Sequence, residues 1–279
     1  LGLHVSPDID TVTYTLAGVA NPETGWGRAD ETWNFMEALD ALGGETWFSL
    51  GDKDLALHVE RTRRLRAGDS LSDITADVCA RLGIAARVLP MSNDSVRTVV
   101  ETEAGVLAFQ RYFVEHKCAP ALKAVRFEGA GDARLEPGIE KLLRSPELGA
   151  VILCPSNPYL SIDPVLAVPG MRNLLSETQA PVVAVSPVVG GAAVKGPMAK
   201  IMGELGVEVS HASIARHYEG LIDGLMLDVP EEDIPAGMEI SAGNTLMTTL
   251  EDKVALAHEA LDFAARIDGS GQAGGERTA

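Results

Sequence analysis

The chain has 279 residues, 46% of them hydrophobic and 23% charged, which is typical of a soluble globular protein with room for a full core. Its net charge of −17 argues against non-specific nucleic-acid binding, because phosphate neutralisation needs clustered Lys and Arg. The three cysteines are far apart and show no metal-binding spacing, and no apolar run reaches membrane-spanning length. We therefore expect a cytoplasmic protein with reduced thiols and no nucleic-acid or membrane partner.

The first notable segment is Ser6-Pro7-Asp8-Ile9-Asp10-Thr11. We interpret it as a Pro-stiffened turn that carries two carboxylates two residues apart. Such hard oxygen ligands suit Mg²⁺, which prefers one or two carboxylates together with substrate phosphates. The sequence therefore predicts a metal site at Asp8 and Asp10. Since the chain begins with Leu1 close to this segment, we also expect the natural protein to start earlier.

The first half has helical spacing of apolar residues over 29–42, 52–67 and 71–82. A β-hairpin is predicted over 98–114, with its break at 103–105. We interpret residues 20–145 as a mostly helical insertion. Within it, Trp26 and Trp33 flank Arg28 and Asp30, and the two rings are either a platform for a planar ligand or core anchors. The acidic residues of 52–54 and the nearby His58 either belong to the start of a helix or form part of a functional site. Their spacing is not that of a zinc centre.

The second half alternates short apolar strands with helices. Strands are predicted over 150–154, 181–185, 207–209 and 224–228, and helices over 165–176, 198–205, 213–219 and 250–266. Continuous apolar strands between helices are typical of a parallel sheet covered on both faces. The fold class is therefore α/β, with a Rossmann-like sheet core over 146–267, a single domain over 1–267 and a disordered tail over 268–279.

Two polar loops follow strands of this predicted sheet. Pro155-Ser156-Asn157-Pro158 can hold an anion or a base edge through Ser156 and Asn157, or it can simply cap the next helix. The second loop runs from Ser186 to Pro197. In it Gly190 permits a close backbone approach and Lys195 offers a charge to a phosphate, although the Walker A ending is absent.

Seven stretches occur in order along the chain and together resemble the CofD-like family. They are SPDIDTVTYTLAG (6–18), GWGRADETW (25–33), LGDKDLALH (50–58), LPMSND (89–94), PSNPYLSIDPVLAVPGMR (155–172), AVSPVVGGAAVKGPMAK (184–200) and NTLM (244–247). Members are 2-phospho-L-lactate transferases of coenzyme F-420 biosynthesis and their phosphoenolpyruvate-using bacterial relatives. Each stretch alone is a weak signal, but the ordered set covers nearly the whole chain.

The resemblance implies transfer of a phospho-lactyl or phospho-enolpyruvyl group from a guanosine diphosphate-linked donor to the deazaflavin Fo, with release of GMP and a need for Mg²⁺. Asp10 matches the family's metal-binding carboxylate, and Asp8 is the second candidate. Ser156, Asn157, Ser186, Gly190 and Lys195 lie in loops expected on the nucleotide side. Trp26, Arg28 and Asp30 are expected on the acceptor side. The partners are thus small-molecule substrates, and the family is compatible with a homodimer.

Two departures from the family pattern stand out. A Gly-rich GGxGG turn and an Asn-Thr-x-Asp-Asp-type segment precede SPDIDT in the family and are absent here. Ser49 takes a position where archaeal members carry a basic residue that contacts Fo. Two alternatives therefore stay open: a non-catalytic nucleotide-sugar-binding regulatory protein of the related fold, and a plain α/β nucleotide-binding domain.

Overall fold

The centre of the molecule is a four-stranded parallel sheet with the strand order β4-β5-β8-β9. The computed structural model describes residues 1–193 and 196–273. The strands are β4 (Val151–Leu153), β5 (Val182–Val185), β8 (Gly224–Leu227) and β9 (Glu239–Ala242). Both β5 and β8 are buried along their whole length, which explains their continuous apolar sequences. The predicted parallel sheet flanked by helices is confirmed.

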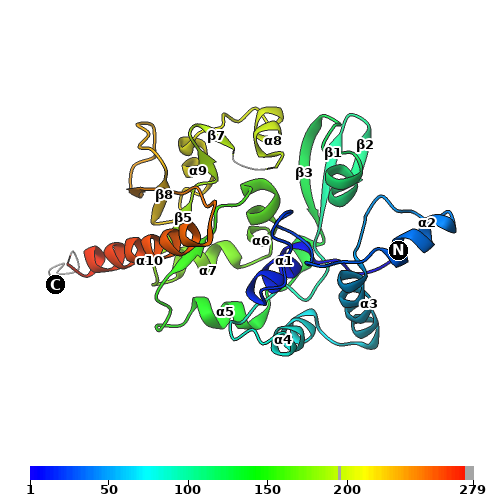
Figure 1. The fold of residues 1–279 in the computed structure, drawn as a ribbon. Helices are drawn as coiled ribbons and strands as arrows, with labels where there is room; N and C mark the ends of the chain where they lie inside the picture. The colour runs from blue at the N-terminus through cyan, green and yellow to red at the C-terminus, as the bar shows by residue number, and fades with distance from the viewer. Residues whose placement is uncertain (194–195, 274–279) are drawn as a thin grey trace.

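Helices cover both faces of this sheet. On one face α10 (Leu250–Ala273) runs along β5 and β8, and its Phe263 shares an apolar cluster with Val183 and Met226 (Figure 1). On the other face, Ala184 and Leu225 belong to a larger cluster. That cluster includes residues of α7 (Met171–Glu177), α8 (Met198–Glu204) and α9 (His211–His217). Within the described residues, no helix is both long and apolar enough to span a membrane.

The insertion contains a three-stranded antiparallel sheet with the order β2-β1-β3. The predicted hairpin is present as β1 (Arg97–Thr102) and β2 (Gly105–Ala108), and β3 (Leu122–Glu128) was not predicted. This sheet is joined to the core through α8. Ile201 of α8 is fully buried in the same cluster as Val100, and the backbone N–H of Leu122 donates to Glu204 at 3.0 Å.

The remaining helices lie mostly in the first half. They are α1 (Pro7–Leu16), α2 (Asn34–Ala41), α3 (Asp52–Ala67), α4 (Leu71–Arg81), α5 (Pro137–Leu143) and α6 (Asp163–Leu166), with short turns η1 (Arg111–Glu115), η2 (Ala130–Asp132) and η3 (Pro158–Ile162). The predicted boundary near residue 68 has a clear cause. Gly68 ends α3 with φ of 102°, and Ser70 caps α4 by accepting from the Asp73 amide, as left-handed glycine caps and serine N-caps do.

Several predictions about elements were wrong. Residues 6–11 are not a turn, because Pro7 begins α1, where proline is favoured since it lacks the N–H that a first turn leaves unpaired. Residues 207–209 form no strand, whereas β9 was missed. The predicted helix over 165–176 is two helices, α6 and α7, separated around Pro169. Finally, α10 extends to Ala273, so the start of the predicted tail is helical, and 274–279 lie outside the described residues.

Candidate functional site

Polar segments follow all four strands of the parallel sheet at one edge. Because the strands are parallel, their carboxyl ends lie together, and ligands of open α/β sheets bind outside these ends. Ser156 and Asn157 follow β4, the segment from Ser186 to Gly190 follows β5, Asp228 follows β8, and Thr245 lies three residues beyond β9. The fold therefore gathers the first predicted loop and the start of the second at a single edge.

Asn157 fits both interpretations of its loop, as a cap of the next helix and as a contact for a ligand. Its side-chain oxygen accepts from the backbone N–H groups of Tyr159 and Leu160, at 3.0 and 3.3 Å, and so caps η3. Its Nδ2 is buried and has no partner within the described residues. A buried donor without a partner is rare and costs free energy. Asn157 is thus both a cap and a donor that a ligand oxygen could satisfy, while its neighbour Ser156 is half-buried.

Thr245 is a candidate that the analysis of the sequence did not single out. Its side chain is 4% exposed, and its hydroxyl also has no hydrogen-bond partner among the described residues. It belongs to the NTLM stretch, which was the available signal. With Asn157, it gives the carboxyl edge two buried polar groups that still lack partners.

Ser186 is buried and faces inward, not toward a ligand. Its exposed fraction is 1%, and its Oγ lies 2.8 Å from Nδ1 of His211. His211 Nε2 lies 2.8 Å from Asp228, and the other Asp228 oxygen accepts from the Gly190 backbone N–H at 2.5 Å. The predicted direct contact between Ser186 and substrate does not fit this burial. His211 and Asp228 were missed because only the fold brings these segments together.

Gly190 forms the turn of the small hairpin between β6 (Val188–Val189) and β7 (Ala192–Ala193). Its φ is +59°, a conformation that glycine adopts without strain. Because the Gly190 N–H donates to Asp228, this amide is already paired, and the close approach of a ligand to the backbone at Gly190 stays a prediction. The predicted phosphate contact at Lys195 lies outside the described residues.

Asp10 and Asp8 point to different sides of α1. Residues two apart on a helix lie about 200° apart around its axis, so Asp8 is exposed while Asp10 is 5% exposed. Both Asp10 oxygens accept from the guanidinium of Arg61 on α3, one of them at 3.1 Å. This bidentate ion pair is the strong form of such a contact.

The predicted Mg²⁺ site does not fit this arrangement. Both oxygens of Asp10 are engaged by Arg61, and Asp8 lies on another side of the helix. Within the part of the chain that the structure describes, no group of three or more His, Cys, Asp or Glu side chains is placed to hold a metal ion. We therefore derive no catalytic step through a metal, and dependence on Mg²⁺ stays a prediction.

A buried polar network surrounds the Asp10–Arg61 pair. The hydroxyl of Tyr14 donates to Asp54 at 2.6 Å, and Nε2 of His58 lies 3.2 Å from the same carboxylate. Burial opposes the ionisation of Asp54, but the bonds from His58 and Tyr14 outweigh it and lower its pKa. Burial and the bond to Asp54 raise the pKa of Tyr14 far above its usual range. The network ties α1 to α3.

Comparison with known proteins decides the family. Residues 1–253 match the family model described as "2-phospho-L-lactate transferase CofD". The chain is 42% identical over 277 residues to a phosphoenolpyruvate transferase of Streptomyces griseus, covering 95% of this chain and 86% of that protein. It is 39% identical over 275 residues to a 2-phospho-L-lactate transferase of Methanopyrus kandleri, covering 96% and 87%.

The chain belongs to the CofD family. Among solved structures, it is similar to a member of the UPF0052 family from Bacillus halodurans, with a TM-score of 0.51 and 16% identity over 88% of this chain and 81% of that one. Identity this low supports the shared fold alone.

Two CofD stretches, 25–33 and 50–58, lie against each other. Glu31 accepts from the backbone N–H groups of Lys53 and Asp54, each at 2.8 Å, and so caps α3. Thr32 donates to Asp52 at 2.6 Å, and Asp52 in turn accepts from amides at the start of α2. The acidic residues of 52–54 are therefore explained by capping and by the Tyr14 network.

The residues predicted on the acceptor side of this CofD protein lie near this junction. Trp26 is 61% exposed, so it is not a core anchor. The Arg28 guanidinium stacks 5.5 Å from the centre of the Tyr14 ring, and its buried Nε has no partner among the described residues. Asp30 and Ser49 are exposed, and the Asp30 carbonyl accepts from Lys53 Nζ at 2.5 Å.

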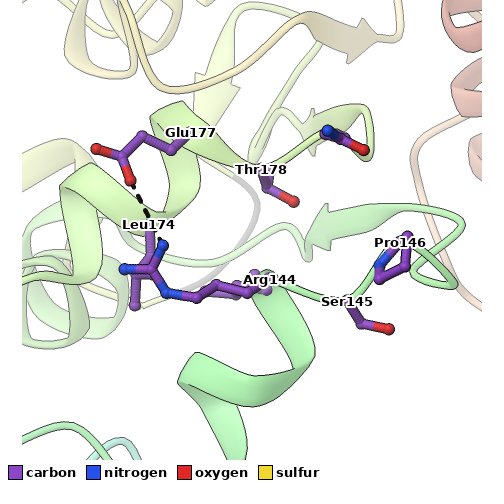
Figure 2. Close-up of a pocket in the computed structure, with 8 residues that line it drawn as sticks. Arg144, Ser145, Pro146, Leu174, Glu177 and Thr178 are labelled. Atoms are coloured by element: carbon purple, nitrogen blue, oxygen red, sulfur yellow. Dashed lines mark ion pairs between the residues drawn. The ribbon is translucent and has the colours of Figure 1, made fainter.

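A cavity of about 270 Å³ lies elsewhere on the CofD core. Figure 2 shows Arg144 and Glu177 on one side of it and Ser145, Pro146 and Thr178 around the rest. These residues end α5 and α7, which precede β4 and β5. The cavity is therefore at the amino ends of the strands, the opposite edge from the polar segments, and we assign it no part in the candidate site.

Proposed function

We propose that the chain transfers a phospho-enolpyruvyl or phospho-lactyl group from a guanosine diphosphate-linked donor to the terminal ribityl hydroxyl of Fo. The hydroxyl oxygen forms a bond to the phosphorus that carries the three-carbon acid. The bond from that phosphorus to the bridging oxygen breaks, and GMP leaves with this oxygen. The proton of the hydroxyl passes to solvent. Such reactions depend mainly on alignment and on charge stabilisation.

The observation that carries this proposal is the set of unsatisfied polar groups at the carboxyl edge of the sheet. Asn157 Nδ2 and Thr245 Oγ1 are both buried without a partner among the described residues, and both follow strands of the parallel sheet. Polar groups in this state need an explanation, and a ligand at this edge would complete the hydrogen bonds of both. The names of the relatives, phosphoenolpyruvate transferase and 2-phospho-L-lactate transferase, support a donor that carries a phospho-acid.

The side chains divide the work between the two substrates. Asn157 and Thr245 bind polar atoms of the nucleotide donor. Trp26 presents an exposed ring on which the planar deazaflavin stacks, and Arg28 contributes positive charge beside it. Asp10 acts through Arg61, since their ion pair holds α1 against α3. In this role Asp10 organises the acceptor side and does not touch the reacting atoms.

The assay is direct. The purified chain is incubated with Mg²⁺, Fo and the guanosine diphosphate-linked enolpyruvate, lactate or glycerate in parallel, and mass spectrometry measures the Fo adduct while chromatography measures GMP. We expect an adduct with equimolar GMP, and its mass identifies the three-carbon acid. Nucleotide binding without any adduct would contradict transfer and favour the nucleotide-sugar-binding alternative. Omitting Mg²⁺ in the same assay checks the predicted metal dependence.

A Trp26→Ala variant tests the acceptor side separately. Because the Trp26 ring is 61% exposed, its removal should leave the midpoint of thermal unfolding unchanged. Loss of one base-type stacking contact of about 1–3 kcal/mol should raise the KM for Fo about five- to a hundredfold. The KM for the donor should stay the same. An unchanged KM for Fo would place the acceptor elsewhere.

A further inference from the structure

A chain of hydrogen bonds connects three segments behind the candidate site. Ser186 follows β5, His211 begins α9, and Asp228 follows β8. The Ser186 Oγ and the His211 Nδ1 are 2.8 Å apart, as are the His211 Nε2 and an Asp228 oxygen. The second Asp228 oxygen accepts from the N–H of Gly190, at the turn of the β6–β7 hairpin. This hairpin lies in the loop predicted to face the nucleotide.

The ionised partner fixes which atom donates at the Asp228 end of this chain of hydrogen bonds. Burial opposes the ionisation of Asp228, but the bonds from the Gly190 amide and from His211 outweigh it and lower its pKa. An ionised carboxylate only accepts hydrogen bonds, so His211 Nε2 carries a proton and donates to Asp228. In a neutral imidazole Nδ1 then accepts, and the Ser186 hydroxyl donates to it.

His211 is itself held in place from a second direction. Glu231 accepts from the backbone N–H groups of His211 and Ala212, at 2.8 and 3.3 Å. The His211 side chain is 3% exposed, so packing restricts its rotamer. The imidazole is thus a rigid link with Ser186 on one nitrogen and Asp228 on the other.

The three side chains look like a nucleophilic triad, but the geometry favours a different role. Ser186 is 1% exposed, and its Oγ also accepts from the Val188 backbone N–H at 3.3 Å. A nucleophile must reach its substrate, and this hydroxyl points into the protein. The exposed end of the network is instead Gly190.

We propose that His211 is a positioning residue for the nucleotide donor. By donating from Nε2 it orients Asp228, and Asp228 then holds the Gly190 amide and fixes the β6–β7 hairpin beside the carboxyl edge of the sheet. The role in donor binding rests on the proposed function. The link between His211 and the hairpin rests on the hydrogen bonds alone. Placement by a supporting shell of this kind is how binding groups are held to fractions of an ångström.

Two substitutions separate this role from simple packing. In His211→Gln the amide nitrogen reaches the place of Nε2 and can still donate to Asp228. In His211→Asn it reaches only the place of Nδ1, next to Ser186. We expect His211→Gln to keep the donor KM close to that of the parent, and His211→Asn to raise it about tenfold, the equivalent of one hydrogen bond. The value of kcat should change less than KM.

Hydrogen exchange measures how firmly the β6–β7 hairpin is held, and it needs no substrate turnover. His211→Asn should speed deuterium uptake over residues 187–190 about tenfold through loss of the same bond, and His211→Gln should not. His217→Asn is the matched control. His217 is the last residue of the same helix, and its Nε2 makes a bond of equal length, 2.8 Å, to Asp163, so uptake over 187–190 should not change in this variant.

The outcomes are distinct. The positioning role would be overturned if His211→Gln and His211→Asn changed the donor KM and the deuterium uptake equally, or if neither variant changed them. If the parent chain neither binds guanosine diphosphate nor forms an adduct, the proposed function is wrong, and so is the role of His211 in donor binding. The difference in uptake between the two variants then still decides whether His211 holds the hairpin.

Discussion

The Asp10→Asn substitution tests the part of the structure that departs most from the sequence-based expectation. Asp10 is 5% exposed and forms a bidentate pair with Arg61, which is 3% exposed. Asparagine keeps the shape of the side chain but removes its charge, leaving the Arg61 cation buried and uncompensated. Loss of one partner from a buried ion pair costs about 3–5 kcal/mol in the free energy of unfolding.

The expected loss is large enough to measure by two methods. At about 2–4 °C per kcal/mol for a domain of roughly this size, the midpoint of thermal unfolding should fall by about 6–20 °C. Urea unfolding should show a lower midpoint with an unchanged m-value. Asp8→Asn is the matched control, because Asp8 is exposed on the same helix, and its effect should stay within about 0.5 kcal/mol.

A double-mutant cycle completes the test. Asp10→Asn combined with Arg61→Met removes both charges, so the double variant should be more stable than the sum of the single changes predicts, by about 1 kcal/mol or more. If instead Asp10→Asn unfolds like the parent but needs more Mg²⁺ for activity, the structural role is wrong. Asp10 is then the metal ligand that the family resemblance predicted.

Three further predictions follow from particular side chains. Asn157→Asp keeps an oxygen to cap η3 but puts a carboxylate oxygen in the buried place of the unpaired Nδ2, so the donor KM should rise and the urea midpoint should fall, because a buried charge without a partner costs free energy. Asn157→Ala should raise the donor KM with a loss of about 1 kcal/mol of stability from the missing cap. Gly224→Ala should destabilise the protein by about 1–3 kcal/mol, since a Cβ there would lie 2.7 Å from Phe263. At Gly203 in α8 an added Cβ would meet nothing within 4 Å, so Gly203→Ala should stabilise the protein by about 0.5–1 kcal/mol. Hydrogen bonds from the Thr248 hydroxyl and from two backbone amides lower the pKa of Asp252 from 3.8 to about 2. The contribution of Asp252 to stability is therefore complete above about pH 4 and is lost as the pH falls toward 2. Guanidinium unfolding at several pH values should show that Asp252→Asn lacks this part of the acid dependence.

Each of these has a clear contrary result. A donor KM that is the same in Asn157→Asp and the parent would remove Asn157 from the donor site. Equal stability of the Gly224 and Gly203 variants would mean that α10 does not pack on β8 as closely as the structure has it. An unchanged acid limb in Asp252→Asn would mean that the carboxylate does not cap the start of α10.

The sequence by itself determined the type of sheet and the family. Continuous apolar runs such as 181–185 require cover on both faces, and this leaves little choice except a parallel sheet between helices. Capping residues such as Ser70 act within a few positions of themselves, so the boundary between α3 and α4 could also be predicted. The ordered CofD stretches identified the family because each keeps its residues in a local pattern.

The tertiary structure decided how the polar residues of the site are used. The pair Asp8 and Asp10 looked like one metal clamp, but the helix over Pro7–Leu16 turns them to different sides, and Arg61, fifty-one positions from Asp10, takes the buried one. His211 and Asp228 carried no local signal, because their partners Ser186 and Gly190 lie in the distant segment that follows β5. Hydrogen bonds and ion pairs between distant segments depend on where the backbone brings side chains together. Local patterns of apolar residues do not contain that information.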